Sequence, residues 1–320
     1  MALLEIKNLK LDFMAGSRPL RAVDDVSITI EAGETVCLVG ESGCGKSVTA
    51  LSIAQLVPMP PARYPGGEIL LNGRDVLKMS KTELRSIRGG TVSYVFQDPA
   101  ASLNPVFRVG NQIKESLKLH RPEKATDAEV VRLLKLVGIP APESRIKDYP
   151  HQMSGGMQQR VMIAMALASE PKLLVADEPT TALDVTIQAQ ILELLLDLKK
   201  RLGMSILLIT HNLGIVGDIA DRVAVMYAGQ VVEMSPAREL LKRPLHPYTK
   251  ALMNSVPKLS GNEQRLKAIP GNVPMPGQLP AGCRFFPRCP SAHPECQTRM
   301  PELVEVEPKR WVRCLYPKEL

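Results

Sequence analysis

A chain of 320 residues accommodates one large domain, or a large domain with a small one. Hydrophobic residues make up 45% and charged residues 23%, which is ordinary globular composition and excludes a disordered or fibrous protein. The net charge of +7 fits a solvated basic surface or a docking surface for anionic lipid or nucleic acid, but aromatics at 4% leave few platforms for stacking single-stranded bases.

Membrane-spanning and secretory segments are not expected. No apolar run reaches the roughly 18–20 residues needed to span a bilayer. The closest run, residues 191–198, is interrupted by Glu193 and Asp197. The start of the chain lacks the basic region and long apolar core of a signal peptide. We therefore expect a cytosolic chain that works at a membrane only through a partner.

The first part of the chain changes from strand patterns to a helix pattern. Residues 3–13 and 26–30 alternate apolar and polar side chains and predict strands. Residues 31–34 predict a turn, and residues 35–39 form a continuous apolar run, as expected of a strand buried on both faces. A glycine-rich loop follows, and then a helical pattern over residues 47–56.

The middle of the chain predicts helices around two further buried strands. Residues 98–160 are polar, lack strong strand runs and are predicted to be mostly helical. Residues 173–176 and 205–209 are apolar runs of strand length, joined by an amphipathic helix over residues 186–202 that Gly203 ends. Alternation of strand, helix and strand predicts parallel α/β architecture.

The last part of the chain predicts a hairpin and then a separate extension. The hairpin spans residues 223–232 and turns at Ala228 and Gly229. After residue 257 the chain is rich in Pro, Gly and Asn and has no periodicity, which predicts a linker. We therefore expect a main domain over residues 1–257 and a C-terminal extension over residues 258–320.

The glycine-rich loop after the first buried strand fits the pattern G-x-x-x-x-G-K-S, in which backbone N–H groups wrap a β-phosphate. Lys46 is expected to reach the β- and γ-phosphates, and the Ser47 hydroxyl to ligate Mg²⁺. A bare glycine-rich turn is the alternative, but the strand before the loop and the helix after it are the required context. The predicted nucleotide-binding residues are Gly40, Glu41, Ser42, Gly43, Cys44, Gly45, Lys46 and Ser47.

The strand predicted at residues 173–176 is followed by two acids, Asp177 and Glu178. Carboxyl ends of parallel strands meet at one edge of a sheet, so Asp177 is expected beside the phosphate loop, where it can hold Mg²⁺ through water. Glu178 can then accept a proton from the attacking water. A strand that merely ends in exposed acids is the alternative, which the phosphate loop disfavours.

Residues 153–160, Met-Ser-Gly-Gly-Met-Gln-Gln-Arg, resemble the signature motif of ABC ATPases. Together with the phosphate loop they make the chain similar to the nucleotide-binding subunits of ABC transporters. That resemblance implies an α/β P-loop ABC ATPase core, in which a parallel sheet is joined by an antiparallel β subdomain, and a helical subdomain over about residues 98–160.

The resemblance also implies roles for single residues. Gln97 matches the Q-loop glutamine that touches Mg²⁺ and faces the membrane partner, and His211 matches the switch histidine near the γ-phosphate. Each of these short pieces alone has a plain structural reading, as a loop amide or a strand-end histidine, but their order along the chain supports the family. The further implied residues are Phe13 stacking on adenine, Ser154, Gly155 and Gly156 contacting the γ-phosphate, and Asp184 in the D-loop of residues 181–184.

Two positions depart from the family's usual motifs. Met157 stands where the signature usually has glutamine, and Gln158 is a candidate to offer an amide nearby. Asn212 replaces the acid that usually follows the switch histidine. The resemblance further implies that the signature serine of a second cassette closes over ATP held by the first, so hydrolysis requires a dimer.

Four of the six cysteines lie in the last forty residues, with five, six and seventeen residues between them. In a reducing compartment such a group favours a metal over disulfides. The intervals are unlike those of a zinc ribbon, whereas a Cys₄ iron–sulfur cluster tolerates wider spacing; zinc and free or disulfide-bonded thiols stay open as alternatives. The four residues are Cys283, Cys289, Cys296 and Cys314.

The C-terminal region resembles that of the di- and oligopeptide importer ATPases at residues 245–252, 269–272 and 283–290. In that subfamily a 4Fe–4S cluster held by the four tail cysteines is implied, and a methionine in the signature is like the subfamily too. Three arginines flank the cysteines and could offset the charge of thiolates: Arg284, Arg288 and Arg313.

The resemblance implies an ATP-hydrolysing subunit on the cytoplasmic face of the cell inner membrane that powers import of di- or oligopeptides. The implied partners are a second, similar ATPase or a second copy of the chain, two transmembrane permeases and indirectly an extracytoplasmic peptide-binding protein, without nucleic acid. Another small cargo, such as nickel or glutathione, is the alternative within the same machine. A soluble ABC ATPase of DNA repair or translation is disfavoured because the chain has one cassette and no sustained heptads. A kinase is opposed by the signature and by His211.

Overall fold

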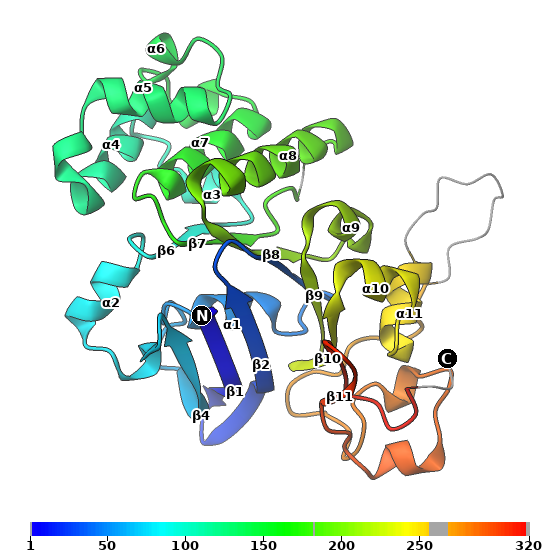
Figure 1. Cartoon of the computed structure of the whole chain (residues 1–320). Coiled ribbons are helices and arrows are strands. Elements are labelled where there is room, and N and C mark those ends of the chain that lie inside the picture. The colour runs from blue at the N-terminus through cyan, green and yellow to red at the C-terminus, as the bar shows by residue number, and fades with distance from the viewer. Residues whose placement is uncertain (1, 182, 256–267, 318–320) are drawn as a thin grey trace, which may run out of the picture. The chain divides into compact units, whose positions relative to one another are not determined.

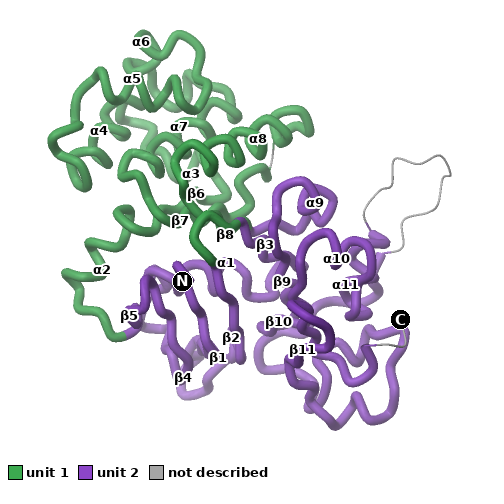
Figure 2. Tube along the Cα trace, viewed as in Figure 1, with its two compact units in different colours: residues 1, 31–34, 78–208 green, residues 2–30, 35–77, 209–320 purple. Residues whose placement is uncertain are grey.

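The computed structural model describes residues 2–181, 183–255 and 268–317. Ala182 of the predicted D-loop and residues 256–267 of the predicted linker lie outside the described residues. The chain divides into two compact units, shown in Figure 2. Unit 1 consists of residues 31–34 and 78–208, and unit 2 of residues 2–30, 35–77 and 209–320.

Unit 2 contains a four-stranded antiparallel sheet with the order β2-β1-β4-β5. Its strands are β1 (Ala2–Ala15), β2 (Arg18–Glu31), β4 (Ala62–Leu71) and β5 (Arg74–Asp75). The strands predicted at residues 3–13 and 26–30 are confirmed as parts of β1 and β2. Strand β4 was not predicted, because Pro65, Gly66 and Gly67 interrupt its alternation; the register of β1 with β4 shifts on both sides of the Lys10–Gly66 pair.

The strands of a second, larger sheet that belong to unit 2 have the order β11-β12-β10-β9-β3. Strand β3 (Thr35–Val39) is buried along its whole length, as its apolar run predicts, and pairs in parallel with β9 (Arg222–Tyr227). The predicted hairpin is confirmed: β9 and β10 (Gln230–Pro236) are antiparallel, and Ala228 and Gly229 both have positive φ, as a tight two-residue turn requires. Nearer the C-terminus, β12 (Arg310–Val312) pairs with β10, and β11 (Val304–Glu307) pairs with β12.

The helices of unit 2 are short. Helix α1 follows the phosphate loop but ends at Ser52, earlier than predicted. Three residues later Gln55 has a positive φ, which a continuing helix does not allow. Short 3-10 turns follow His211 and lie in the segment that contains Cys289 and Cys296. The elements are α1 (Lys46–Ser52), η1 (Val76–Lys78), η4 (Leu213–Ile215), α9 (Val216–Ile219), α10 (Ala237–Lys242), α11 (Pro247–Asn254), η5 (Phe286–Arg288) and η6 (Pro294–Gln297).

Unit 1 contains β6, β7, most of β8 and the longer helices of the chain. Strand β6 (Val92–Val95) pairs in parallel with β7 (Leu173–Asp177), and β8 spans Ser205–Thr210. Residues 98–160 are mostly helical, as predicted, and α4, α5 and α7 pack together (Figure 1). The helices are α2 (Lys81–Ile87), α3 (Pro99–Ser102), α4 (Val109–His120), η2 (Pro122–Lys124), α5 (Asp127–Leu136), α6 (Pro142–Arg145), η3 (Pro150–Gln152), α7 (Gly155–Leu167) and α8 (Val185–Leu202).

Helix α8 shows how the sequence sets an element's limits. Asp184 caps its first turn by accepting a hydrogen bond from the Ile187 N–H at 2.9 Å, and Gly203 ends it in the left-handed conformation, with φ 65°. The predicted helix over residues 186–202 is therefore confirmed. Among the residues that the structure describes, no helix combines the length and apolar character needed to cross a membrane.

Candidate nucleotide site and cysteine pocket

The phosphate loop is built on very close backbone contacts within unit 2. A Cβ atom on Gly40 would lie 2.2 Å from the Met226 carbonyl oxygen, so only glycine allows the loop to leave β3 beside β9. Gly45 has φ 105°, a conformation that L side chains rarely adopt. The Gly229 N–H of the hairpin turn donates to the Cys44 carbonyl at 2.8 Å. Strand β9 and the hairpin turn after it therefore hold the phosphate loop in place through backbone contacts.

Lys46 is directed into its own loop. Its side chain is 5% exposed, and its Nζ donates to the carbonyl oxygens of Gly40 at 2.8 Å and Glu41 at 3.0 Å. The loop thus holds a buried ammonium beside the backbone that the sequence assigns to a phosphate. Ser42, Gly43 and Ser47 are exposed on the same loop.

In unit 1 the parallel pairing of β6 with β7 brings two predicted catalytic residues together. Val95 is opposite Ala176, so Gln97 and Glu178 both follow the carboxyl ends of neighbouring strands. The Gln97 Nε2 donates to the Glu178 Oε2 at 3.1 Å, and the Thr181 hydroxyl donates to the same oxygen at 2.9 Å. This contact was not predicted, because no strand was expected at residues 92–95; the pairing of β6 with β7 creates it.

Glu178 has an unusual backbone. Its φ is +46°, a conformation that non-glycine residues seldom adopt and that tends to persist where surrounding contacts enforce it, often at functional sites. Asp177, the last residue of β7, is half-buried. The two acids therefore differ in setting: one ends a regular strand, and the other occupies the strained first position of the following turn.

The signature residues form the start of helix α7. Ser154 caps it by accepting from the Met157 N–H at 3.4 Å. The Gln158 amide is already used, because its Nε2 donates to the carbonyls of Pro150 at 2.9 Å and Met153 at 3.2 Å. The hypothesis that Gln158 replaces the missing signature glutamine is not favoured by this geometry, since both of its N–H groups hold the preceding turn.

The remaining predicted residues of unit 2 lie on separate elements. Phe13 is half-buried on β1 opposite Ala62. His211 is exposed directly after β8. Asn212, the position that departs from the family, caps the next 3-10 turn by accepting from the Gly214 N–H at 2.9 Å. That side chain therefore has a local structural role, which an aspartate could also fill.

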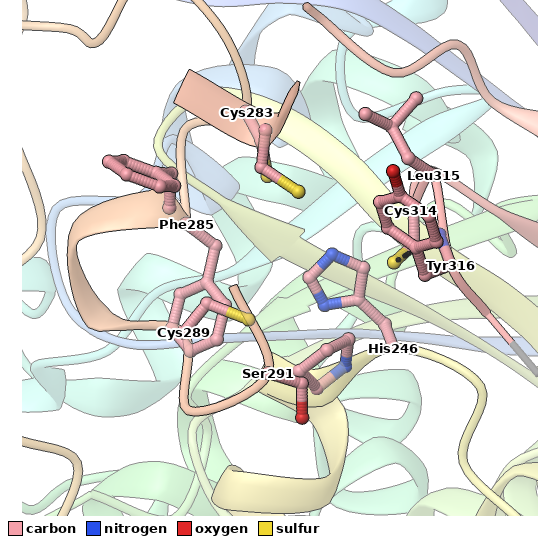
Figure 3. A pocket seen from close by; sticks show the side chains of 11 residues that line it. His246, Cys283, Phe285, Cys289, Ser291, Cys314, Leu315 and Tyr316 are labelled. Carbon is pink, nitrogen blue, oxygen red and sulfur yellow. Dashed lines mark hydrogen bonds between the residues drawn. The ribbon is translucent and has the colours of Figure 1, made fainter. Parts of the chain in front are cut away.

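All four tail cysteines line one pocket of unit 2, together with His246, Phe285, Ser291 and Tyr316 among others (Figure 3). Cys283 is joined to Cys296 by a hydrogen bond from its N–H to the Cys296 carbonyl, at 2.8 Å. Cys289 follows η5 directly, and Cys314 follows β12, so different elements supply the sulfurs. Residues far apart in the sequence are thus brought together, although no group of three or more His, Cys, Asp or Glu in the described ranges is arranged to hold a metal ion.

Burial favours the protonated form of three thiols in this pocket. Burial raises the pKa of Cys283, Cys289 and Cys314, that of Cys314 to about 11. Backbone N–H groups partly offset the rise; the Tyr316 N–H, for example, lies 3.4 Å from the Cys314 sulfur. Such N–H···S contacts stabilise thiolates and tune iron–sulfur centres. Binding of a metal would therefore release protons here.

The three arginines beside the cysteines are paired with acids elsewhere in unit 2. Arg284 binds Asp24, Arg313 binds Asp25 at 3.0 Å, and Arg288 binds Glu41 at 2.7 Å. The prediction that they offset the charge of thiolates therefore needs correction: their principal partners are carboxylates of β2 and of the phosphate loop. A local pattern of Arg next to Cys could not reveal partners so far away along the chain.

His246 lies in the cysteine pocket and was missed by the sequence reasoning. It is 1% exposed, and burial lowers its pKa to about 3, so the imidazole is neutral. Its Nδ1 accepts from the Tyr248 N–H at 3.1 Å, which caps α11. The buried Glu233 carboxylate accepts from the Leu245 N–H at 2.8 Å and the His246 N–H at 2.9 Å. The residues just before α11 are therefore fixed by buried polar groups.

The comparisons with known proteins agree with this geometry. Residues 23–181 match the family described as ABC transporter, and residues 232–296 match the oligopeptide/dipeptide transporter C-terminal region. The oligopeptide transport ATP-binding protein AppD of Bacillus subtilis (strain 168) is 52% identical over 320 residues, which cover 99% of this chain and 98% of AppD. The dipeptide transport ATP-binding protein DppD of Escherichia coli (strain K12) is 48% identical over 319 residues, covering 99% of this chain and 97% of DppD.

Two solved cassettes share the fold. The dimeric ATP-binding cassette MJ0796, in a post-hydrolysis state bound to ADP and Pi, matches with a TM-score of 0.65 and 28% identity, over 73% of this chain and 99% of that one. The cbiO1 protein from Clostridium perfringens, part of the ABC transporter complex cbiONQ, gives the same TM-score and identity over 75% and 91% of the two chains. These matches confirm the predicted P-loop ABC ATPase fold. The chain belongs to the ATP-hydrolysing subunits of ABC transporters, in the group that carries the oligopeptide/dipeptide transporter C-terminal region.

Proposed function

We propose that this chain binds MgATP on its phosphate loop and hydrolyses it to power the import of di- or oligopeptides. The observation that carries the catalytic part is the preformed loop, in which buried Lys46 faces the Gly40 and Glu41 carbonyls. The assignment of a peptide cargo is supported by the C-terminal match at residues 232–296 and by relatives named for oligopeptide and dipeptide transport.

Each predicted residue has a proposed role in that reaction. Lys46 and the loop N–H groups bind the β- and γ-phosphates, and Ser47, Gln97 and Asp177 are the proposed ligands of Mg²⁺, which neutralises phosphate charge when bound. Glu178 accepts a proton from the attacking water, and His211 contacts the γ-phosphate. Phe13 stacks on adenine, and Ser154, Gly155, Gly156 and Asp184 act on the ATP of a second cassette.

We infer that the working unit is a pair of cassettes, formed with a similar ATPase or a second copy, on two permeases at the cytoplasmic face of the inner membrane. An external peptide-binding protein completes the importer. Within the chain we propose that residues 1–257 form the ATPase domain and residues 258–320 the extension. ATPase stimulation by the permeases, and none by DNA, is the expected result. Stimulation by DNA alone would overturn the assignment.

Cargo is tested separately. In vesicles that contain the assembled importer, ATP hydrolysis should rise when the binding protein is loaded with a dipeptide or oligopeptide. Nickel or glutathione would raise it instead if the chain serves another small solute within the same machine.

For the cysteine pocket we propose a 4Fe–4S cluster held by Cys283, Cys289, Cys296 and Cys314. The four cysteines that line one pocket and the Tyr316 N–H directed at the Cys314 sulfur support it. A cluster there would tie together η5, η6 and the segment after β12, so its role is structural. About four irons and four acid-labile sulfides per chain are expected in anaerobically purified protein. Their absence, or zinc in their place, would refute the cluster, and Cys289→Ser should abolish the iron.

A further inference from the structure

A residue of the C-terminal extension binds the phosphate loop. Arg288 is almost fully buried, with a side chain that is 4% exposed, and it forms a two-point ion pair with Glu41, the second residue of the loop. The Arg288 Nη1 lies 2.7 Å from one carboxylate oxygen and the Nη2 lies 3.0 Å from the other. A planar guanidinium paired with a carboxylate in this way fixes orientation as well as distance.

The same guanidinium binds the backbone of an earlier segment of the extension. Its Nε donates to the Pro270 carbonyl at 2.8 Å, and its Nη2 also donates to the Ile269 carbonyl at 3.3 Å. It also lies over the Tyr227 ring, 5.7 Å from the centroid. Arg288 therefore links three pieces of unit 2 that are distant in sequence: the phosphate loop, the segment at Ile269 and Pro270, and the β9–β10 hairpin.

A second contact holds the backbone of the same loop residue. The Glu41 N–H donates to the Tyr248 hydroxyl at 2.9 Å. Tyr248 is fully buried and packs on Tyr227 and Phe285, with ring centroids 4.7 and 5.3 Å away. Since the Glu41 carbonyl accepts from the Lys46 Nζ, movement of Glu41 would also move the acceptor that positions the lysine.

The extension also forms a wall of the cavity at the loop. Gly40, Glu41, Ser42 and His211 line this cavity together with Ile269 and Asn272. Its volume of about 610 Å³ lies within the range of ligand pockets. The segment at Ile269 that Arg288 binds therefore faces the same space as His211, which is assigned to the γ-phosphate.

We propose that Arg288 is a positioning residue for the nucleotide site: through Glu41 it fixes the phosphate loop in its binding conformation, so the extension sets the affinity for ATP. Arg288 acts through Glu41 and has no assigned contact with the nucleotide. The proposal rests on the proposed nucleotide role of the loop. Loss of Arg288 should weaken ATP binding and raise KM, while turnover at saturating ATP changes little.

The test measures the Kd for MgATP, KM and kcat of the full chain in the assembled importer. Arg288→Met should weaken ATP binding roughly 10- to 100-fold, the value of a lost hydrogen-bonded charge pair. Arg288→Lys keeps the charge without the two-point geometry and should recover part of the affinity. Glu41→Gln should weaken binding as well, and adding it to Arg288→Met should cost little more, because both changes break the same contact.

Arg313 supplies a matched control. Like Arg288, it precedes a tail cysteine, is buried and pairs with an acid, but its partner is Asp25 on β2 and not the phosphate loop. Arg313→Met should lower stability to a similar degree and leave KM for ATP near the wild-type value. Equal increases in KM for both variants would overturn the positioning role, since general loosening of the extension would then explain them.

Lys46→Ala separates failure of this inference from failure of the proposed function. If Lys46→Ala weakens ATP binding and Arg288→Met leaves the Kd within two-fold of wild type, the inference on Arg288 is wrong. If Lys46→Ala itself leaves the Kd unchanged, the loop is not the nucleotide site, and the proposed function fails with the inference.

Discussion

Removal of the Glu233 carboxylate should destabilise the segment that begins α11. Glu233 is fully buried on β10 and accepts hydrogen bonds from the N–H groups of Leu245 and His246. Burial raises the pKa of this carboxyl group, and the two N–H donors act in the opposite direction. The buried carboxylate therefore accepts from two backbone N–H groups that would otherwise be left without a protein acceptor.

The size of the effect follows from those two donors. A buried donor left without an acceptor costs about 1–3 kcal/mol, so Glu233→Ala should lower the free energy of unfolding by about 2–6 kcal/mol. Glu233→Gln keeps one carbonyl oxygen for one donor but turns an NH₂ group toward the other, and should cost roughly half as much.

Urea denaturation followed by circular dichroism, at constant nucleotide and salt, measures both variants. A loss below about 1 kcal/mol for Glu233→Ala would refute the reasoning, because water or a shift of the backbone would then satisfy both donors. So would a Glu233→Gln variant that is less stable than Glu233→Ala, since the retained oxygen should help.

Three further predictions concern the loop, the pocket and the signature. Gly40→Ala places a Cβ against the Met226 carbonyl and should weaken ATP binding roughly ten-fold or more, measured by nucleotide titration; unchanged affinity would contradict the contact. Because the folded pKa of His246 is about 3 and its ordinary value is 6.5, only the unfolded chain takes up this proton between those pH values. The free energy of unfolding should therefore fall as the pH falls from 6.5 to 3, and His246→Asn, which keeps an acceptor for the Tyr248 N–H, should flatten that slope in pH-dependent urea denaturation. Ser154→Ala removes the cap of α7 and should lower the free energy of unfolding by about 1 kcal/mol. It should also lower ATP turnover in the assembled dimer; full turnover would show that the hydroxyl is not needed at the phosphate.

Features encoded by neighbouring residues could be predicted from the sequence. The apolar run of β3, the glycines and lysine after it, and the acids at the end of β7 form local patterns whose physics is well defined. The turn at Ala228 and Gly229 is equally local.

Features that depend on distant partners could not be predicted in this way. Arg288 and Glu41 are 247 residues apart, and nothing near either residue reveals the other. His246 was hidden for the same reason, because its burial depends on β10, η5 and the chain after β12 folding around it. Strand β4 was missed because Pro65 and its neighbouring glycines resemble a loop, although pairing with β1 overrides their local preference.

Replacement of Glu178 by glutamine tests the central claim most directly. Glu178→Gln keeps the size of the side chain and an oxygen for the Gln97 and Thr181 donors, but it cannot accept the proton of the attacking water. In the assembled importer it should bind MgATP like the wild type and lose turnover by about 10²–10⁴-fold, while Glu143→Gln, at an exposed acid of the same unit, should change neither. Turnover of Glu178→Gln close to that of the wild type would contradict the account.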